Sequence, residues 1–170
     1  PPRPPIDALT LDAAKHFNAG RFAEALAMVD GVLKIEPREP KALNTRANCL
    51  FKLGRKDEAC AAIDTAVLAM PGDLTFWVNK AFIEKGAGKL PDASRSAIDL
   101  VEIAQVTGAK VDAVEHASRL IAELHGKGIA PAPRSHLGFV GLGFASMIAG
   151  RPDQALAHFD KAVAASPRNV

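Results

Sequence analysis

The side chains of this sequence that could take part in acid–base or metal chemistry are mainly its histidines. The histidines are His16, His116, His125, His136 and His158. None of them forms a His-x-x-x-His pair, which would place two imidazoles on one helical face for a metal such as zinc. His116 and His125 lie nine positions apart on one predicted helix, too far along its axis to share an ion. This spacing favours solvated or partner-contacting histidines, and we predict no metal site.

Glycines and serines give equally little support for a phosphate site or a nucleophile. Gly138, Gly141 and Gly143 form G-x-x-G-x-G, but a linker that includes Pro133 precedes them, where a dinucleotide loop needs a strand. No Gly-Lys-Ser/Thr follows. The serines Ser94, Ser96 and Ser146 lack the strand-turn-helix context of a nucleophile elbow. We therefore predict no catalytic residue and no cofactor, and expect that this chain is not an enzyme.

The composition is that of a folded domain: 170 residues, 48% of them apolar, with a net charge of +2. Lys and Arg are scattered among acidic residues, which argues against a nucleic-acid partner. The longest apolar run lies within residues 137–149, shorter than the roughly 20 residues of a membrane span. Only two cysteines, Cys49 and Cys60, and no visible signal peptide predict free, mostly buried thiols and a cytoplasmic location.

Self-similarity along the chain shows which elements position these side chains. Four copies of one pattern align, the first three spaced by 34 residues and the last displaced by 62. The aligned columns are Gly20, Gly54, Gly88 and Gly150; Ala25, Ala59, Ala93 and Ala155; and Val29, Ile63, Ala97 and Phe159. Upstream of each glycine lie two further columns: Leu9, Leu43, Trp77 and Phe139, and Ala13, Ala47, Ala81 and Gly143. A fixed period of this length indicates a repeat architecture.

Each copy has the spacing of two amphipathic helices. Leu43, Ala47 and Leu50 lie at i, i+4 and i+7, and the segment after Gly54 continues with the same period. The glycine separates the paired helices, where a tight turn needs a residue without Cβ strain. Pro91 and Pro152 suit the first turns of helices, and Asp73 and Ser135 are expected helix N-caps.

Residues 107–134 break the pattern. One amphipathic helix is predicted from Val111, Val114, Ala117, Ile121 and Leu124, followed by the glycine- and proline-rich linker of residues 126–135. The linker either runs back along this helix or acts as a hinge near Lys127. We thus predict a proline-rich leader at 1–6, three units at 7–106, the irregular helix and linker at 107–134, and a last unit at 135–170.

With four copies in register, the sequence resembles the tetratricopeptide repeat family. The family pattern W-x2-L-G-x2-Y, A-x3-F and P is matched by Phe139, Leu142, Gly143, Ser146, Ala155, Phe159 and Pro167. The resemblance implies an all-α solenoid of stacked helical hairpins. It also implies a scaffold that binds a protein or peptide partner, an extended segment or a helix, in a concave groove lined by the first helix of each unit.

The groove residues that the resemblance implies are Lys41, Asn44, Asn48 and Lys52 in the second unit and Asn79, Phe82 and Lys85 in the third. Asn48 and Asn79 fall on columns where family members hold a peptide backbone, because an amide offers both donor and acceptor. Asn44 replaces a lysine of the two-carboxylate clamp, which argues against recognition of chaperone tails. Lys41, Lys52 and Lys85 favour an acidic peptide.

In the last unit the same columns are apolar: Leu137, Val140, Gly141, Phe144 and Ile148. If exposed, this patch is a partner site or a site of self-association. If covered, it seats the irregular helix or chain beyond Val170, which is the interpretation we prefer.

A second hypothesis treats the chain as part of a longer protein. Tetratricopeptide arrays resembling this one precede glycosyltransferase, sulfotransferase and methyltransferase domains in bacteria. In that case the array is the N-terminal arm that recruits a substrate to the enzyme.

Overall fold

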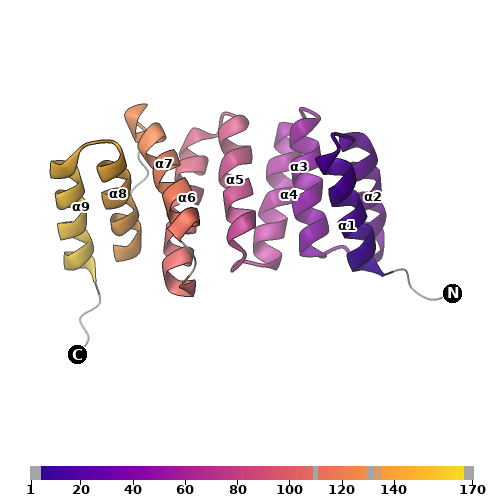
Figure 1. Ribbon diagram of the computed structural model, residues 1–170, viewed down its shortest axis with the longest axis horizontal. Helices are drawn as coiled ribbons and strands as arrows, with labels where there is room; N and C mark the ends of the chain where they lie inside the picture. The colour runs from indigo at the N-terminus through magenta and orange to yellow at the C-terminus, as the bar shows by residue number, and fades with distance from the viewer. Residues whose placement is uncertain (1–4, 109–110, 130–132, 134, 167–170) are drawn as a thin grey trace. The chain divides into compact units, whose positions relative to one another are not determined.

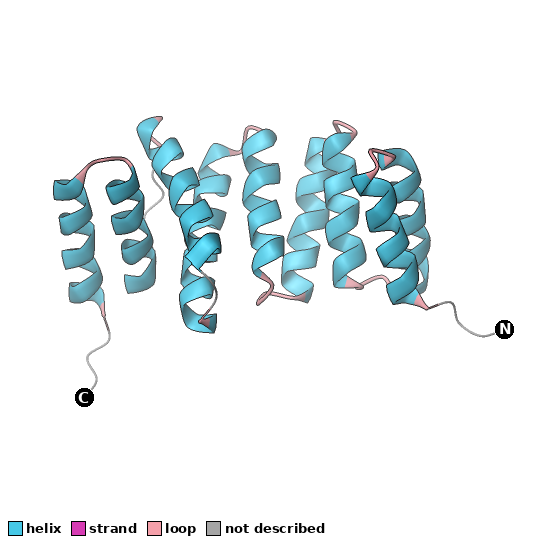
Figure 2. Ribbon diagram, viewed as in Figure 1, coloured by secondary structure: helices cyan, strands magenta, loops and turns pink. Residues whose placement is uncertain are grey.

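The computed structural model describes residues 5–108, 111–129, 133 and 135–166. Within these residues the chain is helical and contains no strand (Figures 1 and 2), as the repeat pattern predicts. The helices are α1 (Ile6–Asn18), α2 (Phe22–Ile35), α3 (Pro40–Lys52), α4 (Lys56–Ala69), α5 (Leu74–Gly86), α6 (Leu90–Thr107), α7 (Val111–Gly126), α8 (His136–Ile148) and α9 (Pro152–Ala165).

The helices divide into two compact units, Pro1–Ala87 and Gly88–Val170. In the first unit α1, α3 and α5 pack side by side in one layer, while α2 and α4 form a second layer behind them (Figure 1). Each helix of this unit also packs on the next one along the chain. Consecutive packing of this kind is the hallmark of a repeat array, in which each pair needs its neighbour to cover its apolar face.

Small residues set the spacing between paired helices. Ala13 and Ala25, from α1 and α2, are completely buried, and so are Ala47 and Ala59 from α3 and α4. The turn between each pair relies on glycine: Gly54, between α3 and α4, has a φ of +79°, a conformation that costs other residues free energy. The columns of small residues in the sequence therefore correspond to buried positions of the paired helices.

The predicted helix starts are confirmed at Asp73 and Ser135. The Asp73 carboxylate accepts a hydrogen bond from the Thr75 amide at 2.8 Å, and the Ser135 hydroxyl accepts one from the Gly138 amide at 3.3 Å. Pro91 and Pro152 lie in the first turns of α6 and α9. These caps satisfy backbone donors that the first turn of a helix leaves without partners.

The two cysteines belong to the core of the first unit. Cys49 and Cys60 are free thiols and both are buried, as predicted. Burial, with a smaller contribution from the Asp30 carboxylate, raises the pKa of Cys49 to about 11. Because the thiolate is the reactive form, this thiol is unreactive at neutral pH.

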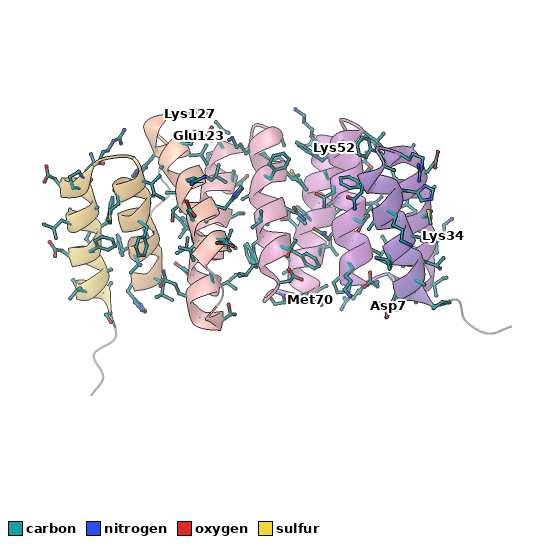
Figure 3. The ribbon with its side chains drawn as sticks, in the orientation of Figure 1. Asp7, Lys34, Lys52, Met70, Glu123 and Lys127 are labelled. Carbon is teal, nitrogen blue, oxygen red and sulfur yellow. The ribbon has the colours of Figure 1, made fainter. Side chains whose placement is uncertain are left out.

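The second unit contains the irregular helix that the sequence predicts. It is α7, a single helix that packs against both α6 and α8. At its end Lys127 Nζ lies 2.9 Å from Glu123 Oε1 (Figure 3), and Gly128 follows with a φ of +78°. Residues 130–132 and 134 of the predicted linker lie outside the described residues, so the choice between hinge and packed return stays a prediction.

Close approach in the second unit relies on glycines of α8. A methyl group at Gly143 would overlap the ring of Phe159 on α9, and one at Gly141 would lie 3.1 Å from Val101 Cγ1 on α6. These glycines therefore serve helix packing, which explains the motif that superficially suggests a phosphate loop. The last copy of the repeat forms the hairpin of α8 and α9.

The overlap at Gly143 predicts that Gly143→Ala lowers the free energy of unfolding by about 1–3 kcal/mol, because the Phe159 ring must move. The matched control is Gly31→Ala in α2, where nothing lies within 4 Å of the added methyl group. This control should raise stability by about 0.5–1 kcal/mol through helix propensity. Urea unfolding followed by circular dichroism measures both. Equal stabilisation by the two variants would contradict close packing at Gly143.

Candidate functional site

A pocket of about 380 Å³ lies on the layer formed by α1, α3 and α5 in the first unit. Its wall consists of Asp7, Thr10, Leu11, Ala14, Lys41, Asn44, Thr45 and Phe76. The α1 residues recur at helical spacing, so they share one face of that helix. The pocket therefore joins three consecutive first helices of the repeat, which is the surface on which the sequence places a groove.

The α1 side of the pocket was missed in the sequence analysis, although the repeat could have revealed it. Asp7 and Thr10 precede Lys41 and Asn44 by the repeat length of 34. The Thr10 side chain is buried, and its hydroxyl has no hydrogen-bond partner within the described part of the chain. Since buried polar groups are usually paired, this hydroxyl is a candidate partner for a ligand that enters the pocket.

Asn44 and Asn79 form the central polar contact of this surface. The Asn79 side-chain amide donates to the side-chain oxygen of Asn44 at 2.9 Å, which links α5 to α3. An amide offers two donor hydrogens and an acceptor oxygen, so the pair retains the Asn44 NH₂ group and the Asn79 oxygen for other partners. Together these are the complementary groups that a peptide unit requires.

The other predicted groove residues lie further along the same helices. Asn48 is half-buried one turn after Asn44 on α3, and Lys52 is exposed at the C-terminal end of that helix. Asp7, in the first turn of α1, lies toward the opposite end of this layer (Figure 3). On α5 the ring of Phe82 packs edge-on against Phe51 with centroids 5.4 Å apart, and Lys85 is half-buried in the last turn. The structure thus joins Lys41, Asn44 and Asn79 closely and spreads the remaining four.

A second pocket, of about 500 Å³, lies between α7 and α8 in the second unit. Its wall consists of Gln105, Val114, Glu115, Ser118, Val140, Phe144 and Ile148. Three members of the predicted apolar patch therefore face this pocket, across from the irregular helix. The Ser118 hydroxyl is buried in its wall and lacks a hydrogen-bond partner among the residues that the structure describes.

The apolar patch is divided between two neighbours. Gly141 is buried against Val101 of α6, whereas Phe144 remains 42% exposed at the α7 pocket. Leu137 is half-buried near the start of α8. The expectation that the irregular helix would be seated on this patch is matched in part, since α7 packs on α8 but leaves an open pocket between them.

Two histidines that the sequence analysis did not place together lie close to each other in the second unit. The rings of His125 on α7 and His158 on α9 have centroids 6.3 Å apart. Burial lowers the pKa of His158, and the nearby positive charges of Lys161 and of protonated His125 lower it further.

Among the described residues no group of three or more His, Cys, Asp or Glu side chains could hold a metal ion. None of the described helices is both long and apolar enough to span a membrane.

Comparison with protein families matches residues 16–77 to the Tetratricopeptide repeat. No curated protein matches the sequence. Among solved structures, the tetratricopeptide domain of Sgt2 from Aspergillus fumigatus is 16% identical, with a TM-score of 0.64 over 79% of this chain and 88% of that one.

Two further structures share the fold. The first tetratricopeptide domain of human RPAP3 is 18% identical, with a TM-score of 0.59 over 71% of this chain and 95% of that one. The fragment of MamA from residue 41 to its end, from Desulfovibrio magneticus, is 18% identical, with a TM-score of 0.54 over 94% and 75% of the two chains. At these identities the likeness concerns the fold alone.

The environment of His158 predicts that the protein loses stability as the pH falls through and below about 6.5. Because the folded-state pKa is below that of the unfolded chain, the unfolded chain binds the proton more readily, and the loss stops below the folded-state pKa. Thermal melts at several pH values should show a smaller acid loss for His158→Gln. The exposed His116→Gln is the control and should melt like the wild type. An unchanged acid loss in His158→Gln would contradict the assignment.

Proposed function

This chain carries tetratricopeptide repeats, and we propose that it is a non-catalytic scaffold that holds an extended peptide on the α1, α3 and α5 surface of its first unit. Binding of protein partners is the common role of this fold. The observation that supports this site is the hydrogen-bonded pair of Asn44 and Asn79 beside a pocket shared by three first helices. The peptide backbone would accept from the Asn44 NH₂ group and donate to the Asn79 oxygen.

The rest of the pocket wall supplies a second kind of contact. Leu11 and Phe76 give apolar surface next to the unpartnered Thr10 hydroxyl. This combination fits a peptide that places a side chain with a polar tip in the pocket while its backbone follows the asparagines. A pocket of this volume, about 380 Å³, lies within the range of known ligand sites.

Charge favours an orientation of the peptide. Lys52 is exposed at the C-terminal end of α3, whereas Asp7, in the first turn of α1, lines the pocket beside Lys41 and offsets its charge. Acidic residues of the peptide would therefore lie toward Lys52. Such exposed charges act mainly on the rate of association and weaken with salt.

The asparagine pair gives the decisive test. We expect a peptide selected from a library on the wild-type protein to bind Asn44→Ala/Asn79→Ala about tenfold more weakly, because backbone hydrogen bonds are lost. Asn48→Ala should have a smaller effect, since Asn48 lies one turn away. Isothermal titration calorimetry measures the affinities.

The control is Thr65→Ala, which removes a polar group from α4, a helix of the other layer. It should bind the peptide as the wild type does. Wild-type affinity in the double variant, with circular dichroism showing an intact fold, would reject the site.

The α7–α8 pocket supports a second candidate, the anchoring of an apolar side chain of a partner. Val140, Phe144 and Ile148 line one wall, and Phe144 is held edge-on by Phe159 at 5.6 Å between centroids. The unpartnered Ser118 hydroxyl beside them could accept a hydrogen bond from the partner. A largely apolar pocket with a few polar groups, here Gln105, Glu115 and Ser118, is typical of a binding site.

Filling this pocket tests the second candidate. Val114→Phe adds a ring to the α7 wall and should abolish binding of a library peptide selected for the second unit, without affecting the groove peptide.

Ser118→Ala should raise the free energy of unfolding by about 1 kcal/mol, because it removes a buried hydroxyl without a partner among the described residues. Calorimetry and urea unfolding measure these effects. Unchanged peptide binding in Val114→Phe would exclude the pocket as the anchor site.

A further inference from the structure

The outer face of α9 carries an apolar stripe with one acidic residue in it. Leu156 is 62% exposed and Val163 is 76% exposed, and the exposed Asp160 lies between them. Their spacing of i, i+4 and i+7 places all three on one side of the helix. Exposed apolar side chains aligned in this way need a reason beyond chance exposure.

Equivalent positions earlier in the chain are covered. In the repeat alignment Leu156 corresponds to Leu26 of α2 and Cys60 of α4, which are 7% and 6% exposed. Val163 corresponds to Val67, which is 6% exposed. The difference is that α3 packs on α2 and α5 packs on α4. The α9 stripe therefore corresponds to the surface of α2 and α4 on which the next helix packs, but no helix covers it among the described residues.

The acidic residue at the position of Asp160 pairs with a basic residue of the next helix in the first two repeats. Asp30 of α2 accepts from the Arg46 guanidinium of α3 at 2.8 Å. One repeat later Asp64 of α4 pairs with Lys80 of α5. Both members of the pair shift by 34 residues, so the contact is a recurrent feature of how a second helix receives the next first helix.

Asp160 occupies the column of Asp30 and Asp64 in the last repeat. The third copy is informative because it carries the buried Ile98 in this column. The helix that follows it is α7, the one that does not fit the repeat. The second helices that carry an acidic residue in this column are thus the ones covered by a regular first helix with a basic residue. Helix α9 carries such an acidic residue, Asp160.

We propose that the face of α9 formed by Leu156, Asp160 and Val163 binds an amphipathic helix of a protein partner through an apolar seam and one ion pair. The covering helices α3 and α5 indicate the chemistry of this partner: a large apolar residue, two variable residues, Arg or Lys, then Ala. The pattern appears as Leu43 to Ala47 in α3 and as Trp77 to Ala81 in α5. This surface lies outside the proposed peptide groove and does not depend on it.

The first helix of a second copy does not meet this requirement. Its residue in the basic column is Asp12, which already pairs with Lys15 at 2.9 Å. Stacking α1 of another copy on α9 would bring Asp12 toward Asp160, and two like charges disfavour such an interface. Charge complementarity therefore selects a partner helix with a basic residue.

The probe for this test is a fluorescein-labelled peptide of residues 39–53 of the chain itself. A lactam bridge from Lys41 to a glutamate in the Thr45→Glu position keeps it helical, because an isolated helix of this length is marginal in water. Fluorescence anisotropy with the whole protein measures binding. We expect saturable binding that weakens about tenfold in Asp160→Arg and also in Leu156→Asp.

Two controls localise the site. Asp92→Arg makes the same charge change at an exposed position of α6 and should bind the peptide normally. A peptide with Arg46→Asp should bind Asp160→Arg better than it binds the wild type, because the ion pair is reversed.

Three results overturn the proposal. The first is the absence of saturable binding to the wild type, and the second is wild-type binding by both α9 variants. The third is a dimer in sedimentation equilibrium that Leu156→Asp abolishes, because it would assign this face to a second copy.

Discussion

The helices of each pair bury alanine or glycine at the same positions of the repeat, and at Gly143 an added methyl group would overlap the Phe159 ring. In the first unit Ala13 of α1 and Ala25 of α2 are buried, and Ala47 of α3 and Ala59 of α4 repeat the arrangement, all without exposure to solvent. Close packing of this kind leaves no room for a larger side chain, so it fixes the spacing of the pair. The side chains on the two outer surfaces of each pair, one on the first helix and one on the second, are positioned by this packing.

From this spacing come two different surfaces. The layer of first helices presents polar side chains, joined between α3 and α5 by the Asn44–Asn79 hydrogen bond. The second helices present an apolar seam with an acidic residue, which the next first helix covers and neutralises through Arg46 or Lys80. Burial lowers the pKa of Lys80, but its bonds to Asp64 and Glu84 outweigh this effect and raise it, so the ammonium stays charged in the seam. One surface is thus available to a ligand, and the other holds the array together.

The second unit uses the same principles with an irregular element. Because α7 takes the place of a regular pair, α8 packs on α6 through Gly138 and Gly141, on α9 through Gly143, and faces α7 across the apolar pocket. Packing on three neighbours accounts for part of the apolarity of α8, while Phe144, Met147 and Ile148 remain exposed. A regular first helix, such as α3, can keep one polar face.

The sequence by itself determined the helices, their caps and turns, and the columns of small residues, because these depend on spacings within a few turns of chain. It also predicted, through the family resemblance, a groove along the first helices, and with the repeat length this prediction could have included Asp7 and Thr10. Only the tertiary structure decided that Asn79 bonds Asn44, that His125 lies beside His158, and that Gly141 is buried while Phe144 is not. Each of these depends on which helices lie side by side and on the side-chain conformations there. For His125 and Phe144 the neighbour is α7, which lies outside the repeat and gives no pattern from which to infer the contact.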